Sequence, residues 1–145
     1  MSVDEGKKGK AYPQFEYEVG REKIREYANA VGESHPVYQD REAARAAGFR
    51  DVVAPPMFAV VYSAGSVAGG VLDPEIGINL ARMLHGSQDF TWGEPVCAGD
   101  LITTQATLAD LSEKPGMTFY VFESVSTNQD GAQTVKGTWT NIVRG

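Results

Sequence analysis

The chain has 145 residues, a length suited to one domain with a single hydrophobic core. Hydrophobic residues make up 42% and charged residues 22%, as in ordinary globular proteins, and no apolar run reaches the ~20 residues that span a bilayer. A formal net charge of -6 argues against nucleic acid as a partner, and the single cysteine, Cys97, excludes an internal disulfide.

The N-terminal stretch MSVDEGKKGK lacks the apolar segment of a secretory signal, so we expect a cytoplasmic protein. Residues 1–11 are charged and without apolar periodicity, which predicts a mobile arm before a domain over residues 12–145. Phe15, Tyr17 and Val19 then alternate with polar residues, a pattern that predicts a half-buried strand.

An amphipathic helix and then a short helix are predicted next. In REKIREYANAVG the apolar residues recur at helical spacing, at Ile24, Tyr27, Ala28 and Val31. In DREAARAAGF the alanines favour a helix, with Asp40 as its N-cap and Gly48 as its stop.

The segment VVAPPMFAVVYSAGSVAGGVL predicts a buried helix. Prolines are tolerated only in the first turn, so the helix should begin at Pro55-Pro56 and run to about Val71. It is apolar nearly all round, which is typical of a core helix. Gly69-Gly70 lacks the downstream Lys-Ser/Thr of a phosphate loop and is expected to end the helix.

The rest of the chain predicts a strand meander. The segments LITTQATLADL, MTFYVFESVST and QTVKGTWTNIV are rich in Thr, Val and aromatic residues, and residues 128–131, with their Asp-Gly pair, predict a tight hairpin. The fold class is therefore α+β, with an antiparallel sheet that wraps the apolar helix.

Two segments carry candidate chemistry. GESHPVYQD, residues 32–40, is either a catalytic loop with Glu33 and His35 as base and acid or a solvated connection. In LHGSQDFTW a single strand would place His85 on one face with Ser87, Asp89 and Thr91, and place Gln88, Phe90 and Trp92 on the other. Alternate strand residues point in parallel, so His85, Ser87 and Asp89 would not converge on one atom as a catalytic triad must. The two histidines have no metal-ligand spacing, and we expect no metal.

In order along the chain stand YEVGREKIREYANAVGESHPVYQD, GFRDVVAPPMF, HGSQDFTWGEPVCAGDLI and the meander. These segments resemble the MaoC-like (R)-specific hydratases and dehydratases over about residues 12–143. More closely they resemble the N-terminal-dehydratase-type branch, which serves as accessory subunits of (3R)-hydroxyacyl-thioester dehydratases. The resemblance implies a single hotdog fold, a curved antiparallel sheet around the helix. It also implies that two hotdogs pair side by side, with acyl-thioester tunnels near their interface.

In the catalytic branch the loop reads approximately G-D-x-N-P-x-H-x-D, and the helix opens with A-H-G. The resemblance places Glu33 at the Asp, His35 at the Asn and Tyr38 at the His of the loop. At the helix entrance it places Pro55 at the His and Pro56 at the Gly, whose N–H binds the thioester carbonyl.

These replacements argue against autonomous catalysis. Proline has no N–H, so Pro56 cannot donate to an oxyanion, and loss of such a donor costs about 10²- to 10³-fold in rate. A phenol at Tyr38 is a poorer base than imidazole, and Glu33 carries its carboxylate one methylene further out. No residue is therefore assigned as catalytic. Substrate contacts are expected from the positions His35, Pro56, Met57, His85 and Gln88.

The leading hypothesis is a non-catalytic or weakly catalytic dehydratase subunit without a cofactor. It would act on acyl-CoA or acyl-ACP in fatty-acid-type metabolism as a heterodimer with a catalytic MaoC-type chain. One alternative is a homodimeric hotdog that binds an acyl chain without chemistry. Another is a hydratase or thioesterase that uses other residues, with His85 and Glu33 as acid and base.

Overall fold

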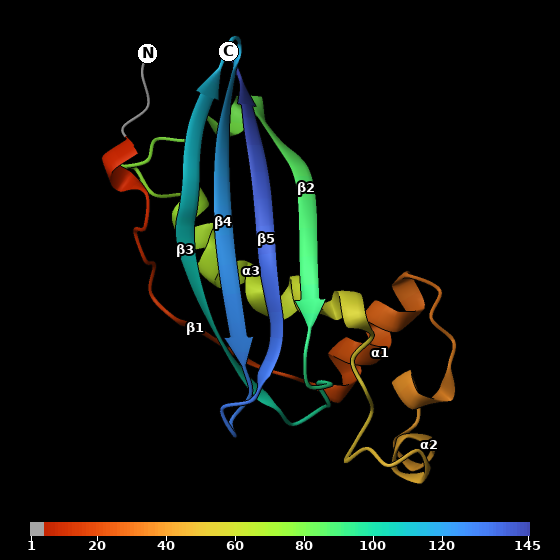
Figure 1. Ribbon diagram of the computed structural model, residues 1–145. Coiled ribbons are helices and arrows are strands. Elements are labelled where there is room, and N and C mark those ends of the chain that lie inside the picture. Colours follow the sequence, from red (N-terminus) through yellow and green to blue (C-terminus); the bar gives the residue numbers. More distant parts are fainter. Residues whose placement is uncertain (1–4) are drawn as a thin grey trace.

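One antiparallel sheet and one helix across its inner face form the centre of the protein. The computed structural model describes residues 5–145. The strand order is β1-β3-β4-β5-β2, and helix α3 (Ala59–Val71) crosses the sheet (Figure 1). This is the predicted α+β hotdog arrangement, a curved antiparallel sheet around a central apolar helix.

The strands of the sheet are β1 (Phe15–Glu18), β2 (Met83–Trp92), β3 (Leu101–Lys114), β4 (Met117–Thr127) and β5 (Gln133–Arg144). Strands β3, β4 and β5 are the three long strands of the predicted meander. The β4–β5 turn holds the predicted Asp-Gly pair, and the Asn128 side chain accepts hydrogen bonds from the amides of Asp130 and Ala132. Such a side-chain-to-backbone turn fixes the register of the hairpin.

The remaining helices are short. They are α1 (Arg21–Ala30), α2 (Arg41–Ala46) and the 3₁₀ turns η1 (Glu5–Lys7), η2 (Pro36–Tyr38), η3 (Pro56–Phe58) and η4 (Leu80–Arg82). Helices α1 and α2 gather beside the end of the sheet where β2 stops (Figure 1). Asp40 caps α2 as predicted, accepting hydrogen bonds from the amides of Glu42 and Ala43.

The two prolines stand at the 3₁₀ turn η3, and α3 itself begins after that turn, at Ala59 rather than at the predicted Pro55-Pro56. Pro55 is the N-cap of η3, and Pro56 is its first residue, so neither proline interrupts the ladder of α3. The apolar face of α3 packs on the sheet. Phe58, the last residue of η3, is fully buried. Gly69 and Gly70 lie inside the last turn of α3, which ends one residue later at Val71. A Cβ at Gly70 would lie 2.2 Å from the Phe122 ring, so this glycine permits close helix-to-sheet approach rather than ending the helix.

A β-bulge in β2 corrects the predicted face of one histidine. His85 is paired with Asn141 and Gln88 with Trp139, and the register shifts between His85 and Ser87. Asn141 and Trp139 are two residues apart on β5 and are both buried. His85 therefore shares the inner face with Gln88, not the outer face with Ser87. One extra residue in a strand reverses the alternation beyond it, and the residue pattern alone does not reveal such a bulge.

The described part of the N-terminal arm lies along β3. The amide of Gly9 donates to the Leu108 carbonyl at 2.7 Å, and the amide of Leu108 donates to the Lys10 carbonyl at 2.9 Å. Residues 1–4 of the predicted arm lie outside the described residues. The mobility of the arm stays a prediction, while its backbone contacts show that it extends the sheet past β1.

Candidate functional site

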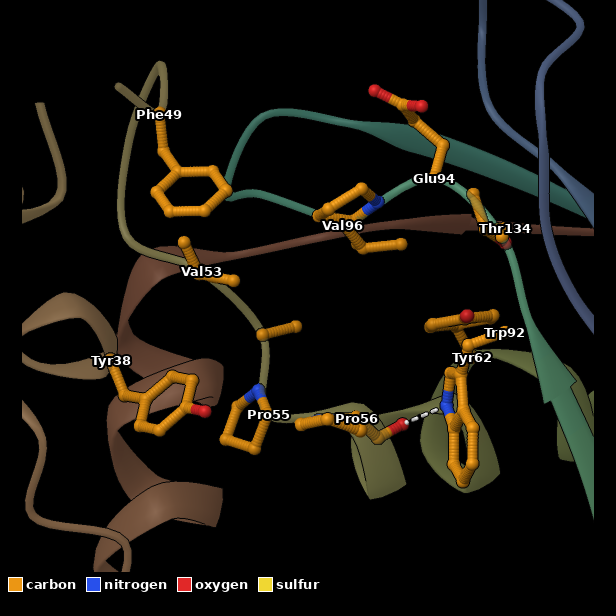
Figure 2. Close-up of a pocket in the computed structure, with 13 residues that line it drawn as sticks. Tyr38, Phe49, Val53, Pro55, Pro56, Tyr62, Trp92, Glu94, Val96 and Thr134 are labelled. Carbon is orange, nitrogen blue, oxygen red and sulfur yellow. Dashed lines mark hydrogen bonds between the residues drawn. The ribbon is translucent and has the colours of Figure 1, made fainter. Parts of the chain in front are cut away.

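A cavity of about 220 Å³ lies where α3 begins. Its walls come from the segment before η3, the loop between β2 and β3, and the side chains of Tyr38 and Tyr62 (Figure 2). The lining is almost wholly apolar or aromatic: Tyr38, Phe49, Val53, Ala54, Pro55, Pro56, Tyr62, Trp92, Gly93, Glu94, Pro95, Val96 and Thr134. The charged residue of this lining is Glu94, and its carboxylate points away from the other side chains in Figure 2.

Trp92 joins the end of β2 to the entrance of α3. Its indole Nε1–H donates to the Pro56 carbonyl at 2.9 Å (Figure 2), although its side chain is 48% exposed. The alternation in β2 predicts only that Trp92 shares a face with Gln88 and Phe90. Its hydrogen bond leaves no signal in the sequence, because the acceptor lies 36 residues away in the chain.

Tyr62 is the second aromatic residue that the sequence motifs do not single out. It lies on α3, is 2% exposed and lines the cavity. Burial raises the pKa of the Tyr62 phenol to about 12, against the smaller opposing effect of a side-chain hydrogen bond with Thr134. A phenol with that pKa stays protonated at neutral pH and can donate a hydrogen bond but cannot act as a base.

Three ion pairs hold the segment that leads into Pro55. Arg21 donates to both carboxylate oxygens of Asp51, at 3.0 and 2.8 Å, and Arg41 lies 3.5 Å from the same carboxylate. The hydrogen bonds from Arg21 lower the pKa of Asp51 to about 2, against the opposing effect of burial. Arg50 donates to the fully buried Asp100 at 2.6 Å. Charge-assisted hydrogen bonds therefore fix this segment at two neighbouring residues.

The loop GESHPVYQD is held by its own polar groups. The Gln39 side chain donates to the Asn29 side chain at 2.9 Å and to the Glu33 carbonyl at 3.2 Å. His35 is exposed and caps η2, since its Nδ1 accepts from the Val37 amide at 3.2 Å. These contacts fit a structural role for His35.

Glu33 and Tyr38 line different cavities. A second hollow, of about 390 Å³, is lined by Tyr27, Val31, Glu33, Pro55, Pro56 and Met57. Tyr38 lines the first cavity, and Pro55 and Pro56 are the residues that belong to both. Neither of these two cavities is lined by both residues at the family's acid–base positions.

His85 and Gln88 lie outside both cavities, on the inner face of β2. The His85 ring stacks on Trp139 with a centroid distance of 6.1 Å. Both polar atoms of the Gln88 amide are buried without a hydrogen-bond partner among residues 5–145. Of the expected substrate contacts, the structure gathers Pro56 and Met57 at the helix entrance, and it places His35, His85 and Gln88 elsewhere.

The first cavity offers a mainly apolar binding surface. Within residues 5–145 no group of three or more His, Cys, Asp or Glu side chains could hold a metal ion. None of the helices described has the length and hydropathy of a membrane span. The first amide of the helix entrance is that of Met57, since Pro56 has none.

Comparisons with known proteins agree with this fold. The family model for the FAS1-like, dehydratase domain region matches residues 7–136. A UPF0336 protein of Clavibacter michiganensis is 43% identical over 146 residues, covering 100% of this chain and 98% of the relative. A UPF0336 protein of Streptomyces griseus is 47% identical over 120 residues, covering 80% of this chain and 78% of the relative.

Solved structures extend the likeness. A chain of the C-terminally truncated HadBC (3R-hydroxyacyl-ACP dehydratase) complex from Mycobacterium tuberculosis superposes with a TM-score of 0.82 at 25% identity, covering 94% of this chain and 96% of that chain. The family model matches most of the chain, and this structural likeness agrees with it, so together they assign the protein to a family. It belongs to the FAS1-like dehydratase-region family of MaoC-like hotdog proteins.

Proposed function

We propose that this chain is the supporting subunit of a (3R)-3-hydroxyacyl-thioester dehydratase. It pairs with a separate MaoC-type chain that carries the intact Asp/His loop, and it supplies a wall of the tunnel that holds the acyl chain of an acyl-CoA or acyl-ACP. The reaction it serves belongs to fatty-acid-type metabolism. The cytoplasmic location expected from the sequence stays a prediction.

The observation that carries the proposal is Pro56 at the entrance of α3. In the catalytic branch that the sequence resembles, this place provides an N–H to the thioester oxygen. Here the pyrrolidine ring removes it, while the Pro56 carbonyl is occupied by Trp92. Preorganised donors of this kind contribute strongly to the rate of acyl-group reactions. A chain without this donor is suited to binding rather than to turnover.

The separation of Glu33 and Tyr38 supports the same assignment. A general base and its partner must both reach the reacting atoms, within about 3 Å or through one water. Here Tyr38 lines the first cavity and Glu33 lines the second, and Pro55 and Pro56 line both. Neither cavity contains the pair of groups that a hydration step needs.

The shape of the site supports a partner chain. The cavity of about 220 Å³ is smaller than the roughly 300–1,000 Å³ of typical small-molecule sites, so an acyl chain of ordinary length needs further walls. Strand β2 ends at this cavity with Trp92, and its other edge has no strand beside it within residues 5–145. A second hotdog placed along β2 would extend the site.

The test is to co-express this chain with a candidate chain that contains the D-x-N-P-x-H loop and to assay hydration of crotonyl and longer enoyl thioesters. In the pair, Glu33→Gln and Tyr38→Phe in this chain should change kcat by less than about threefold. Replacing the partner's loop histidine should lower kcat by about 10²-fold or more, the usual contribution of a general base.

Two results would contradict the division of labour. The first is hydration by this chain alone at a rate comparable to that of the pair. The second is a loss of about 10²-fold when Glu33 or Tyr38 is replaced in the pair, because that size of loss marks a catalytic acid or base. Pro56→Ala restores an N–H at the helix entrance without adding a side-chain acid or base, so it tests the contribution of the missing donor separately.

The second candidate function is a homodimeric binder of an apolar ligand. The apolar lining of the first cavity, with Glu94 directed away from it, favours this function over other non-catalytic ones. Two measurements distinguish this function from the first proposal: the mass of the purified chain and its binding to an acyl thioester and to chains with the intact loop. A homodimer that binds a fatty acyl thioester but ignores every chain with the intact loop would favour the binder.

A further inference from the structure

The two sides of the sheet differ in whether another segment covers the outermost long strand. Strand β2 forms one edge, and its far side has no hydrogen-bonded strand in the described part of the chain. On the opposite side β3 is longer than β1, which pairs only with residues 101–104. Figure 1 shows the N-terminal segment running along β3 past the end of β1.

Backbone hydrogen bonds attach this segment to the part of β3 that β1 leaves free. The amides of Gly9 and Tyr12 donate to the carbonyls of Leu108 and Ala106, at 2.7 and 2.9 Å, and Leu108 donates back to Lys10 at 2.9 Å. Ala11 is bridged to Thr107 in antiparallel fashion. Residues 9–12 therefore use the donors and acceptors through which β3 would pair with another chain.

Charged side chains hold the segment in place. The Lys10 ammonium lies 2.6 Å from Asp73 and 2.7 Å from Glu75, and the Tyr12 hydroxyl donates to Asp73 at 2.9 Å. Asp73 and Glu75 follow the end of α3, more than sixty residues along the chain. This group, Lys10, Tyr12, Asp73 and Glu75, is called the arm latch below.

The rest of the β3 edge carries other features that oppose pairing. A register shift at residue 109 interrupts the ladder with β4, and Asp110 beside it lies 3.2 Å from Lys8. Bulges and charged side chains are the usual means by which sheet edges avoid association. Within residues 5–145 no segment covers β2 in this way, and its Leu84 side chain is 53% exposed.

We propose that residues 5–12 are a built-in cover for the β3 edge, held by the arm latch, which restricts assembly of this chain to the β2 edge. With β3 covered, one chain pairs with one neighbour and the assembly closes. With the cover detached, both edges are open, and head-to-tail addition of further copies has no closing step. The inference concerns the chain itself and does not depend on its ligand or on the identity of a catalytic partner.

The test uses two variants of the full chain. Lys10→Glu places a third carboxylate in the arm latch. Gly9→Pro removes the Gly9 N–H and cannot adopt the positive φ of +87° found at this residue. In both, we expect the Leu108 amide to exchange with solvent roughly fivefold or more faster. We expect the mass from light scattering to rise with protein concentration above the constant mass of the wild-type chain.

Lys23→Glu is the matched charge control. Lys23 lies on α1, is 51% exposed and has Glu26 as its ion-pair partner, at 3.8 Å. The same change of net charge there should leave both the Leu108 exchange and the mass unchanged.

Either of two results overturns the proposal. One is fast Leu108 exchange in a folded variant whose mass stays equal to that of the wild-type chain at every concentration. The other is slow Leu108 exchange in both variants. Circular dichroism separates detachment of the arm from unfolding. If both variants unfold, the wild-type chain in about 1 M salt, where exposed ion pairs are screened, must show the faster exchange and the larger mass, or the proposal fails.

Discussion

Gln88 has a buried side-chain amide with no hydrogen-bond partner among the described residues of the single chain. A buried amide without partners loses its bonds to water and gains none in return, so it destabilises the folded state. Gln88→Leu should therefore raise the free energy of unfolding of the isolated chain by about 1 kcal/mol, measured by urea titration.

The control for Gln88 is another glutamine of the same sheet. The Gln105 side chain donates to the carbonyls of Tyr12 and Ala106, so Gln105→Leu removes made bonds and should lower the free energy of unfolding. Equal losses in both variants would mean that Gln88 is satisfied in solution. If Gln88 serves a neighbour in the assembled protein, Gln88→Leu will stabilise the chain and weaken the assembly.

The Asp51 carboxylate predicts a loss of stability in acid. Its pKa lies near 2 in the folded chain, below the ordinary 3.8, because Arg21 donates two hydrogen bonds to it. Its contribution to stability is therefore complete above about pH 4 and is lost as the pH falls from there toward 2. In urea titrations, Asp51→Asn should be less stable at neutral pH and should lose less stability over that interval. An unchanged slope in the variant would show that the ion pair does not form in solution.

Single residues also show which parts of the site could be predicted from the sequence. The missing donor at Pro56 is a covalent property, so the sequence alone reveals it. The hydrogen bond from Trp92 to that residue depends on how two segments 36 residues apart meet, and only the fold determines it. The assignment of Glu33 and Tyr38 to different cavities likewise depends on the fold.

Among the elements, α3 carries two adjacent glycines with opposite environments. Gly70 is buried, and a Cβ there would lie 2.2 Å from the Phe122 ring. Gly69 is exposed, and its nearest neighbour would be Tyr12 at 3.9 Å. We expect Gly70→Ala to lower the free energy of unfolding by about 1–3 kcal/mol through overpacking. Gly69→Ala should raise it by roughly 0.5–1 kcal/mol, because alanine favours the helix.

Thermal unfolding of the two glycine variants checks this expectation. Each variant is the control for the other, since both add one methyl group in the same helical turn. Melting temperatures that shift in opposite directions support the packing of α3 against β4. A Gly70→Ala variant as stable as the wild-type chain would mean that α3 lies further from the sheet than the structure places it.

Periodicity predicts most elements because it reflects burial. The apolar stripe of α1, the prolines before α3 and the hairpin before β5 all depend on residues close in sequence. Helix α1 and the hairpin form where they are expected, while α3 begins at Ala59, one 3₁₀ turn after the prolines. The bulge in β2 and the pairing of residues 9–12 with β3 depend on contacts across the sheet. Local patterns do not contain those contacts, which is why the predicted face of His85 is wrong.

Across the whole molecule, β2 is the edge of the sheet to which we propose that a second chain adds. Leu84 lies on this edge strand and is 53% exposed. A lysine at such a position opposes pairing, because its charge would have to leave water when a neighbour arrives. Leu84→Lys should therefore weaken association by about tenfold or more, whether with a catalytic chain or with a second copy. Light scattering over a dilution series measures this.

Leu101→Lys makes the same change on β3, toward the opposite end of the strand order from β2. Leu101 is 38% exposed and lies on β3, with β4 and β5 between it and β2. Since β1 already pairs there, the substitution should leave association unchanged while both variants keep the circular dichroism of the wild-type chain. If Leu101→Lys weakens association as much as Leu84→Lys, added charge rather than the β2 edge controls assembly. If neither does, the neighbour binds on another face, and the proposed acyl site is then completed from a direction other than the end of β2.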